Sequence, residues 1–287
     1  MILIDFDMLC HRCYRAMGDL HTSSGISTGL EYGVMRGLRS LPKRLAKNPE
    51  EPLILCFEGF TGASMKKKYP FYKATRDKAP LEFYARKNRL ATMLKQIYSW
   101  AMVPGYEADQ VMHSLSLFNK GVNYIYTNDS DMFQSISGTT VVVRSFRNQI
   151  YFWGKDKLWE KHKVRPCQYA YFKAMTGDKS DNIPGVKRIQ KVWAAEIARR
   201  TDSHYVKKLG LSPSVAFIKC IVEHIPRASQ KLAERMKEFV KEQARINIEL
   251  IRFNDVQVVP FLPLKGSIQD YLDELEIKSF SFDEKEF

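Results

Sequence analysis

The stretch YIYTNDSDMFQS, residues 124 to 135, joins a short apolar run to a polar segment that contains two aspartates. The apolar run is typical of a buried strand. It ends in Thr127, Asn128 and Asp129, and Asp131 follows two residues after Asp129. One carboxylate at a strand end is usually a helix cap or a turn former. Two carboxylates this close together repel each other, so the sequence predicts a positively charged partner beside them.

The composition indicates a globular protein. A chain of 287 residues with 45% hydrophobic residues has the length of one large domain or two ordinary ones. No window approaches the roughly 18 uncharged apolar residues that a membrane span needs, and the acidic start MILIDFDML is unlike a signal peptide. We therefore expect a soluble, intracellular protein, located in the cytoplasm of a bacterium or a phage-infected cell and associated with the nucleoid.

The cysteines predict neither disulfides nor a zinc site. Five of them are scattered along the chain, which fits a reducing compartment. Cys10 and Cys13 form a CxxC pair, but no second Cys or His pair stands at ligand spacing. We interpret them as buried thiols.

Positive charge is concentrated in one part of the chain. The formal net charge is +13, which favours a polyanionic partner. The basic segment, residues 62 to 89, holds nine Lys and Arg residues against Asp77 and Glu82, so nine minus two gives +7. Aromatic residues are interleaved with the cations, a mixture that suits single-stranded nucleic acid. The alternative is a solvated basic helix whose aromatic side chains face the core.

Hydrophobic periodicity predicts an α/β half followed by a helical half. In the first half we expect strands at 1–6, 52–58, 122–127, 139–145 and 149–153, and helices at 29–46, 81–100 and 109–119, with a short helix from about Asp131. This order implies a largely parallel sheet. In the second half we expect helices at 155–162, 166–176, 186–199, 213–224 and 226–251.

Acidic residues follow three of the predicted strands, at the point where each strand ends. They are Asp5, Glu58 and Asp129. The carboxyl ends of parallel strands meet at one edge of an open sheet, where ligands bind. Glu107 and Asp109 stand directly before the helix that leads into the Asp129 strand, so we expect them at the same edge.

Together with Asp131 these residues would form a cluster of six carboxylates, which needs cations to stay ionised. Oxygen ligands select Mg²⁺ or Mn²⁺, and none of the six His residues lies within these motifs. Two such ions about 3.5–4 Å apart can activate a water and stabilise the leaving oxygen of a phosphodiester. Each acid also has a structural alternative: Asp109 could cap a helix, and Asp129 with Asp131 could form an Asx-turn.

The segment MTGDKSDNIPGVKRI, residues 175 to 189, adds Asp178 and Asp181 in a polar loop between helices. Gly185 precedes a predicted helix, where backbone N–H groups can reach a phosphate. Basic residues that follow it would reinforce that contact. The alternative is a plain helix connection with aspartate caps.

These motifs together resemble the 5′-nuclease family, which includes the flap endonucleases and 5′→3′ exonucleases of phages and the N-terminal nuclease domain of bacterial DNA polymerase I. The resemblance runs through nearly the whole chain and in the family's order. The family's metal-binding segments are similar to LIDF, LCFEG, GYEADQ, TNDSDMFQ and GDKSDNIPGV, and the start of its arch, or helical gateway, is similar to FYKATRD.

The resemblance implies a role for each matching residue. The inner metal ligands would be Asp5, Glu107, Asp109 and Asp129. A second ion would be held by Asp131, Asp178 and Asp181, and Glu58 would act directly or through water. Lys73 and Arg76 would stabilise charge on the scissile phosphate. Nucleic acid would be contacted by Lys66, Lys67, Lys68, Tyr72, Arg86, Gly185, Lys187, Arg188 and Lys191.

The implied fold is a PIN-like, mostly parallel central sheet flanked by helices, with the arch at about 60–89. Domain boundaries are expected at 1–163 for this α/β nuclease domain and at 164–287 for a helical domain with a helix-three-turn-helix at about 175–200. The end, YLDELEIKSFSF, is interpreted as a structural closing element, although Ile277, Phe280 and Phe282 could instead form a partner-binding tail.

The implied activity is a two-metal 5′ nuclease that uses Mg²⁺, or Mn²⁺ in its place, on DNA with 5′ ends, flaps or RNA primers. The product would carry a 5′-phosphate and leave a 3′-hydroxyl. The alternatives are a junction-binding protein that has lost the chemistry and a PIN-type RNase. A monomer is expected, with a single-strand-binding protein or a clamp as a possible partner.

The chain departs from the family pattern at two places. Gln110 stands where the family motif commonly reads EADD, and we expect altered metal dependence from it. Arg188, Ile189 and Gln190 stand where relatives usually have Gly-Ile-Gly. Contacts to duplex phosphates would then come from basic side chains of this loop.

Overall fold

A computed structural model describes residues 1–18, 20–45, 51–59, 68–147, 149–266 and 268–278. Its centre is a sheet of six strands in the order β3-β2-β1-β4-β5-β6. Neighbouring strands are parallel except β5 and β6, which form an antiparallel pair. The strands are β1 (Ile2–Asp5), β2 (Leu53–Cys56), β3 (Ser99–Ala101), β4 (Asn123–Tyr126), β5 (Thr140–Phe146) and β6 (Gln149–Trp153).

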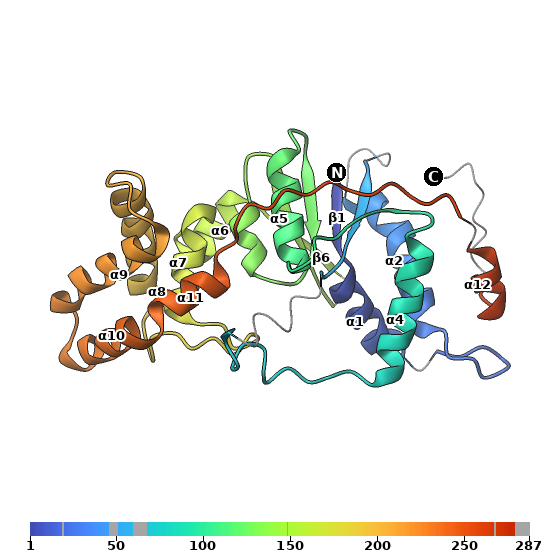
Figure 1. Cartoon of the computed structure of the whole chain (residues 1–287), viewed down its shortest axis with the longest axis horizontal. Coiled ribbons are helices and arrows are strands. Elements are labelled where there is room, and N and C mark those ends of the chain that lie inside the picture. Colours follow the sequence, from blue (N-terminus) through green and yellow to red (C-terminus); the bar gives the residue numbers. More distant parts are fainter. Residues whose placement is uncertain (19, 46–50, 60–67, 148, 267, 279–287) are drawn as a thin grey trace.

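Helices cover both faces of the sheet because side chains along each strand point alternately to opposite sides. Leu3 and Ile125 belong to the core on the side of α5 (Ala108–Phe118). Ile2 and Ile4 belong to the core on the other side, with α1 (Phe6–Met17), α2 (Gly29–Leu45) and α4 (Leu81–Leu94). The alternation that predicted strands therefore also builds a three-layer arrangement, seen in Figure 1.

The second half forms a helical end beside the sheet (Figure 1). The core on the α5 side continues from the sheet through α7 into these helices, so the two halves share one apolar interior. After β6 the elements are α6 (Lys155–His162), α7 (Pro166–Thr176), α8 (Lys191–Arg200), the π-helix η2 (Thr201–Val206), α9 (Pro213–His224), the short η3 (Ile225–Arg227), α10 (Gln230–Glu242) and α11 (Ala244–Ile251).

The last part of the chain returns to the α/β half. Residues 252–266 run without helix along the molecule, and the backbones of Trp100 and Phe261 exchange two hydrogen bonds of 3.0 and 2.7 Å. The chain then forms α12 (Gln269–Glu274). Tyr271, Leu272 and Ile277 are buried in the same core as α4. The structural interpretation of the closing element agrees with this packing, while residues 279–287, including Phe280 and Phe282, lie outside the described residues.

Several helices differ from the sequence-based expectation. Helix α1 was not predicted; it starts directly after β1 because Asp5 caps it, accepting a hydrogen bond of 2.9 Å from Met8 N. The helix expected at 81–100 ends at Leu94, and Ser99 begins the edge strand β3. Both errors arise where one element follows another with hardly a polar loop between them.

Two helices of the second half also differ. The helix expected at 186–199 begins only at Lys191, because Arg188 adopts a left-handed φ of 58° that a helix cannot contain. The helix expected at 226–251 is two helices, α10 and α11, which meet at Gln243 with φ −127°. No helix among the residues that the structure describes is both long and apolar enough to cross a bilayer.

Candidate metal-binding active site

Three groups from two neighbouring strands are tied together where β1 and β4 end. Thr127, which is fully buried, donates from Oγ1 to Asp5 Oδ2 over 2.9 Å and accepts from Asp129 N over 3.1 Å. The parallel register pairs Ile4 with Tyr126, so both carboxylates emerge at one edge of the sheet. One hydroxyl therefore fixes Asp5 and the turn that carries Asp129.

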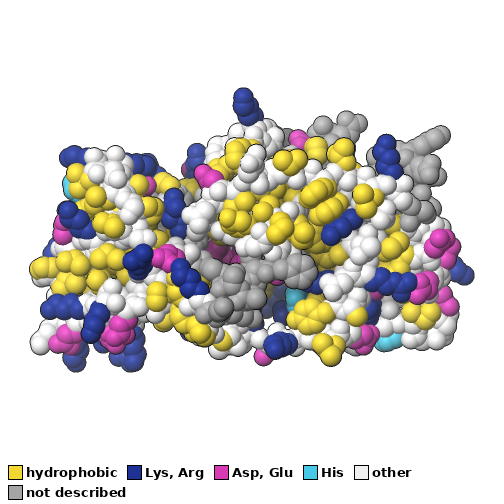
Figure 2. Space-filling model, in the orientation of Figure 1, with side chains coloured by type: hydrophobic (Ala, Val, Ile, Leu, Met, Phe, Trp, Pro, Cys, Tyr) yellow, Lys and Arg dark blue, Asp and Glu magenta, His cyan; other side chains and the backbone are white. Residues whose placement is uncertain are grey.

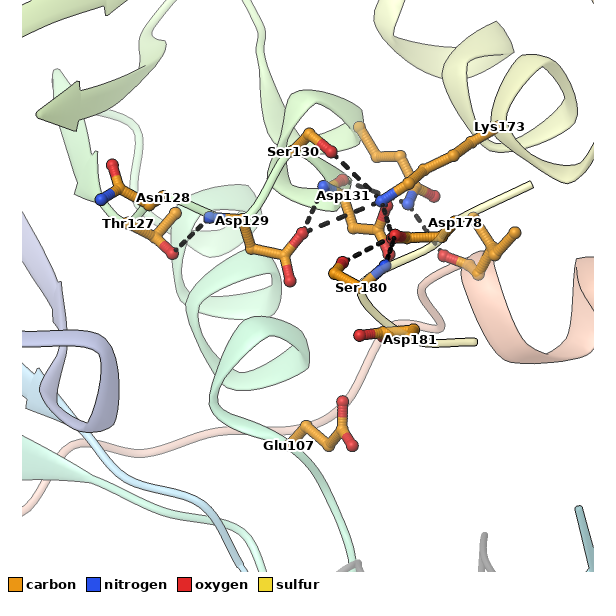
Figure 3. Close-up of polar contacts among 12 residues, drawn as sticks. Glu107, Thr127, Asn128, Asp129, Ser130, Asp131, Lys173, Asp178, Ser180 and Asp181 are labelled. Atoms are coloured by element: carbon orange, nitrogen blue, oxygen red, sulfur yellow. Dashed lines mark hydrogen bonds and ion pairs between the residues drawn. The ribbon is translucent and has the colours of Figure 1, made fainter. Parts of the chain in front are cut away.

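A second group of acids brings the two halves of the chain together. Carboxylate oxygens of Asp131, Asp178 and Asp181 all lie within 4.8 Å of one another. Asp131 starts a short 3₁₀ helix, and its N–H donates to Asp129 Oδ1 over 2.8 Å. The other two lie on the loop between α7 and α8 (Figure 3). We call these three residues the second carboxylate group.

Glu107 and Asp109 complete the edge from the start of α5. Glu107 is the residue before the helix and Asp109 lies in its first turn. Burial raises the pKa of Asp109 well above its ordinary value, and the charges of Asp129, Glu107 and Asp5 raise it further. Asp109 thus lies close enough to these three acids to feel their charge. Glu58 lies beyond the end of β2 with its side chain more exposed to solvent, and its pKa is also raised, first by desolvation and then by the Asp7 and Glu107 charges.

Burial and mutual repulsion raise the pKa values of most of these carboxyl groups. The pKa of Asp5 is raised to about 7, chiefly by burial, and that of Asp131 to about 8, by burial and then by the Asp129 charge. Burial also raises the pKa of Asp181. Asp178 is the exception, because its pKa is lowered. Burial alone would raise this pKa, but the Lys173 charge and hydrogen bonds from Lys173 and Ser180 lower it by more. A cation beside Asp5 and Asp131 would hold them ionised near neutral pH.

Lys173 is a residue that the sequence reasoning missed. It comes from the last turn of α7, is 6% exposed, and points into the second carboxylate group (Figure 3). Its Nζ forms an ion pair with Asp131 and another of 2.5 Å with Asp178, and donates to Ser130 Oγ over 3.1 Å. These charges raise its pKa although burial opposes them. A lysine in the apolar run YAYFKAM, five residues before Asp178, is the signal that could have revealed it.

The predicted phosphate-binding cations also lie at this edge. Lys73 Nζ is 2.6 Å from Glu107 Oε1, and Arg76 contacts Asp181 at 2.5 Å. Tyr72 donates to Glu107 over 3.2 Å and is 5% exposed, so its ring is largely covered. The segment that holds Tyr72, Lys73 and Arg76 therefore packs on the acids through these charges and through the backbone hydrogen bond from Lys73 N to Asp181 O, 2.9 Å.

Other members of the basic segment are engaged elsewhere. Arg86 is bound to the buried Glu31 through two hydrogen bonds and contacts Ser27, so it anchors α4 to α2 rather than facing solvent. The expected nucleic-acid contact from Arg86 therefore conflicts with its place in the fold. Lys68 is exposed and pairs with Glu249 at 2.9 Å. Lys66 and Lys67 lie outside the described residues.

The loop between α7 and α8 is held by close backbone packing. A Cβ added to Gly185 would lie 2.4 Å from Gly177 N and from Thr176 C, so only glycine fits there. Asn247 of α11 donates to the carbonyl oxygens of Ala174 (2.9 Å) and Pro184 (2.8 Å), fastening the loop to α7. The contact made by Gly185 is with the chain itself, while the side chains of Lys187, Arg188 and Lys191 are exposed.

A pocket of about 480 Å³ opens beside Glu107. Its wall combines aromatic rings, amides and cations, the mixture that binds bases and phosphates. Among its lining residues are Lys68, Tyr69, Tyr72, Tyr106, Gln110, Arg252, Phe253 and Asn254. Gln110 therefore faces this pocket, next to the carboxylate edge.

The donor set fits a hard divalent cation. Carboxylate oxygens are its ligands, and the second carboxylate group is compact enough for one ion to reach three of them. Burial is the main cause that raises the pKa values of Asp5 and Asp131, and a bound cation would hold both carboxylates ionised. The residues present therefore fit a divalent metal ion held by oxygen ligands.

Comparison with known proteins agrees with this geometry. Residues 1–163 match the family model described as "5'-3' exonuclease, N-terminal resolvase-like domain". The 5'-3' exonuclease of Aquifex aeolicus is 27% identical over 97% of this chain and 93% of its own length. DNA polymerase I of Thermus aquaticus is 34% identical over 71% of this chain, which spans only 24% of that polymerase.

The fold has a counterpart among solved structures. A bacteriophage T5 flap endonuclease, crystallised with DNA and metal ions, superposes with a TM-score of 0.61 and 16% identity over 92% of this chain and 89% of its own. At this identity the likeness concerns the fold: a mostly parallel sheet flanked by helices, as expected. Because the family model covers more than half of its residues, this chain belongs to the 5′-3′ exonuclease family.

Proposed function

We propose that this chain is a divalent-metal-dependent 5′ nuclease that hydrolyses phosphodiester bonds of DNA, or of RNA primers on DNA, at 5′ ends and junctions. One observation carries the proposal: acids from distant segments gather at one sheet edge, three of them within 4.8 Å, with Lys73 and Arg76 beside them. Family membership and the DNA in the T5 complex support the substrate class.

The acids would hold two Mg²⁺ ions, one with Asp5, Glu107, Asp109 and Asp129, the other with the second carboxylate group. When bound, such ions activate a water and stabilise the leaving oxygen. Thr127 orients two of the acidic segments at once, which keeps the edge in place before any substrate arrives. Glu58 is exposed and would take part through water.

The cations would bind the phosphate that is cleaved. Lys73 and Arg76 lie on the segment that crosses the acids, and their charges complement a phosphate placed there. The single strand next to that phosphate would enter the pocket beside Glu107, where Tyr106 and Phe253 are the partly exposed aromatic side chains. Bases would stack in the pocket, and Lys68 and Arg252 would neutralise the backbone.

The duplex part of the substrate would lie against the helical end. Lys187, Arg188 and Lys191 are exposed on the loop that also carries Asp178 and Asp181. Lys and Arg side chains are spread around the helical end in Figure 2. One loop thus joins duplex binding to the metal site. A cytoplasmic monomer, with a single-strand-binding protein or a clamp as partner, stays a prediction.

A cleavage assay on a 5′-flap DNA labelled at either end tests the proposal. The full chain is assayed with Mg²⁺, Mn²⁺ or EDTA, beside the double variant Asp129→Asn, Asp131→Asn. We expect metal-dependent cutting that the double variant lacks. The matched control is Asp156→Asn, an exposed aspartate in the first turn of α6, which should cut like the wild type. Fragment lengths separate endonucleolytic from exonucleolytic cleavage.

Two results would contradict the proposal. Tight, junction-selective binding without cleavage under either metal would make the chain a DNA-junction-binding protein, and Gln110 would then be the first residue to change to Asp. Cutting of RNA alone, with DNA flaps and RNA primers on DNA left intact, would instead indicate a PIN-type RNase.

A further inference from the structure

Lys173 occupies an unusual position for a lysine. It is 6% exposed, and its aliphatic chain leaves α7 among buried apolar neighbours. Burying an ammonium group is costly unless charged partners compensate for the lost water. Here its Nζ is paired with Asp131 and Asp178 and lies 4.0 Å from Asp129. Besides Ser130 Oγ, which accepts a hydrogen bond of 3.1 Å, the compensating partners are carboxylates that the proposed nuclease needs for metal binding.

The contacts of Lys173 connect the two halves of the chain. Asp131 follows β4 of the sheet, whereas Asp178 lies on the loop after α7. Three carboxylates within 4.8 Å repel one another, and without a cation this repulsion would push the loop away from the sheet. Arg76 neutralises Asp181 from the solvent side, being 45% exposed, and Lys173 neutralises the buried side.

We propose that Lys173 is an internal cation that keeps the second carboxylate group assembled when no metal is bound, and that it competes with a divalent cation for Asp131 and Asp178. The inference rests on the proposed function, because it takes these acids to be metal ligands. Lys173 is a positioning residue: it contacts the acids, and it acts on metal occupancy through them (Figure 3).

The test uses Lys173→Met, which keeps the length of the side chain and removes its charge. Thermal unfolding is followed in EDTA and at increasing Mg²⁺, and bound Mn²⁺ is counted by titration with detection of the free ion by EPR. We expect a lower melting temperature in EDTA, a larger stabilisation by Mg²⁺ than in the wild type, and Mn²⁺ binding at least about tenfold tighter at one site, because a competing charge is gone. Lys173→Arg should behave like the wild type in EDTA.

The matched control is Lys207→Met. Lys207 pairs with Asp202 at 2.8 Å but lies on the helical end and is 59% exposed, so its loss should alter neither Mn²⁺ affinity nor the response to Mg²⁺. If Lys173→Met folds only in the presence of Mg²⁺ and unfolds when EDTA is added, the inference is supported. Equal instability with and without Mg²⁺ would overturn it.

The outcomes separate this inference from the proposed function. A wild-type protein that binds no Mn²⁺ would refute the metal site itself. A wild-type protein that binds Mn²⁺, together with a Lys173→Met variant of unchanged affinity and unchanged melting temperature in EDTA, would refute the role of Lys173 alone.

Discussion

Thr127 helps to hold the acids in place where β1 and β4 end, because its hydroxyl forms hydrogen bonds with Asp5 and with Asp129 N. Thr127→Val keeps the shape and removes both bonds. We expect the free energy of unfolding in EDTA to be about 1–3 kcal/mol lower than in the wild type, because buried polar atoms lose their hydrogen-bond partners. We also expect weaker Mn²⁺ binding. Calorimetry and Mn²⁺ titration measure the two effects.

The control for this change is Thr201→Val. Thr201 is also fully buried, but its hydroxyl bonds to Ile197 O within the helical end. Its loss should lower stability without changing Mn²⁺ affinity. If both variants bind Mn²⁺ like the wild type, Thr127 does not position the acids.

The raised pKa values of Asp5 and Asp131, about 7 and about 8, make stability depend on pH. In the unfolded chain these two carboxyl groups have a pKa near 3.8. Their contribution to the stability of the folded state is therefore fully present below that pH and is lost as the pH rises through 7 and 8. In EDTA we expect the free energy of unfolding to fall by several kcal/mol between pH 5 and pH 8, since a pKa difference of one is worth about 1.4 kcal/mol. Urea denaturation at both pH values measures this.

Two comparisons check the origin of that pH dependence. Asp5→Asn should flatten it, and saturating Mg²⁺ should largely remove the fall above pH 6 by holding the carboxylates ionised. A fall of the same size in Asp5→Asn would assign the effect to other groups.

At the level of single residues, the sequence was informative where chemistry leaves a pattern. Acids at strand ends predicted the edge, because parallel strands must end together. Lys173 and Thr127 carried no such pattern: their roles depend on which segments the fold brings to them. Arg86 has a structural partner that charge alone could not reveal, Glu31, which is buried in α2.

The loop between α7 and α8 offers a test at the level of an element. Gly185→Ala would place a Cβ against the backbone at the end of α7, at 2.4 Å. The loop must then move, which should cost about 1–3 kcal/mol of stability and displace Asp178 and Asp181 from Asp131. Thermal unfolding and Mn²⁺ titration report the two effects. Gly138→Ala is the control, because its Cβ would meet only Lys155 Nζ, at 3.9 Å.

Helix α12 should be essential for the stability of the α/β half. Leu272 is fully buried in the core that includes α4. Leu272→Ala should reduce the free energy of unfolding by about 2–5 kcal/mol. Leu262→Ala, at a site that is 78% exposed, should leave it nearly unchanged. Urea denaturation distinguishes them; equal stability of the two variants would mean that α12 does not support this core.

Element existence was easier to predict than element ends. Strong apolar periodicity indicated α2, α5, α7 and α9, whose bounds agree closely with the prediction. Helix α8 starts late and α10 and α11 separate because of backbone angles at Arg188 and Gln243, which neither periodicity nor composition encodes. The short strand β3 was missed since its partners, β2 and the backbone of Phe261, are distant in sequence.

For the molecule as a whole, the net charge of +13 predicts DNA binding that weakens steeply with salt. In EDTA, which would prevent the proposed metal-dependent cleavage, Lys187→Ala should reduce the slope of log affinity against log salt by about one, and so should Lys191→Ala. Fluorescence anisotropy with a flap DNA, between about 50 and 200 mM KCl, measures this slope. Unchanged slopes would place the duplex elsewhere.

Exposed apolar residues mark the returning segment, residues 252–266. Val259, Leu262 and Leu264 are all more than 60% exposed, and hydrophobic side chains gather over this part of the molecule in Figure 2. The stacking of Phe261 on Trp100, with ring centroids 4.2 Å apart, holds the segment against β3. The second part of the chain therefore includes a segment that packs on the first part. A domain boundary at residue 163 stays a prediction.

The packing of α4 against α12 affects the order in which parts of the protein can fold during translation. Arg89 and Glu274 are 185 residues apart in sequence, yet they form hydrogen bonds, one of 2.8 Å, and Arg89 lies over the Tyr271 ring. While the ribosome is still producing the intervening helices, α4 emerges with one side uncovered. The outer side of α4 can therefore be covered only late in translation, after β1, β4 and the helices of the second half have been made.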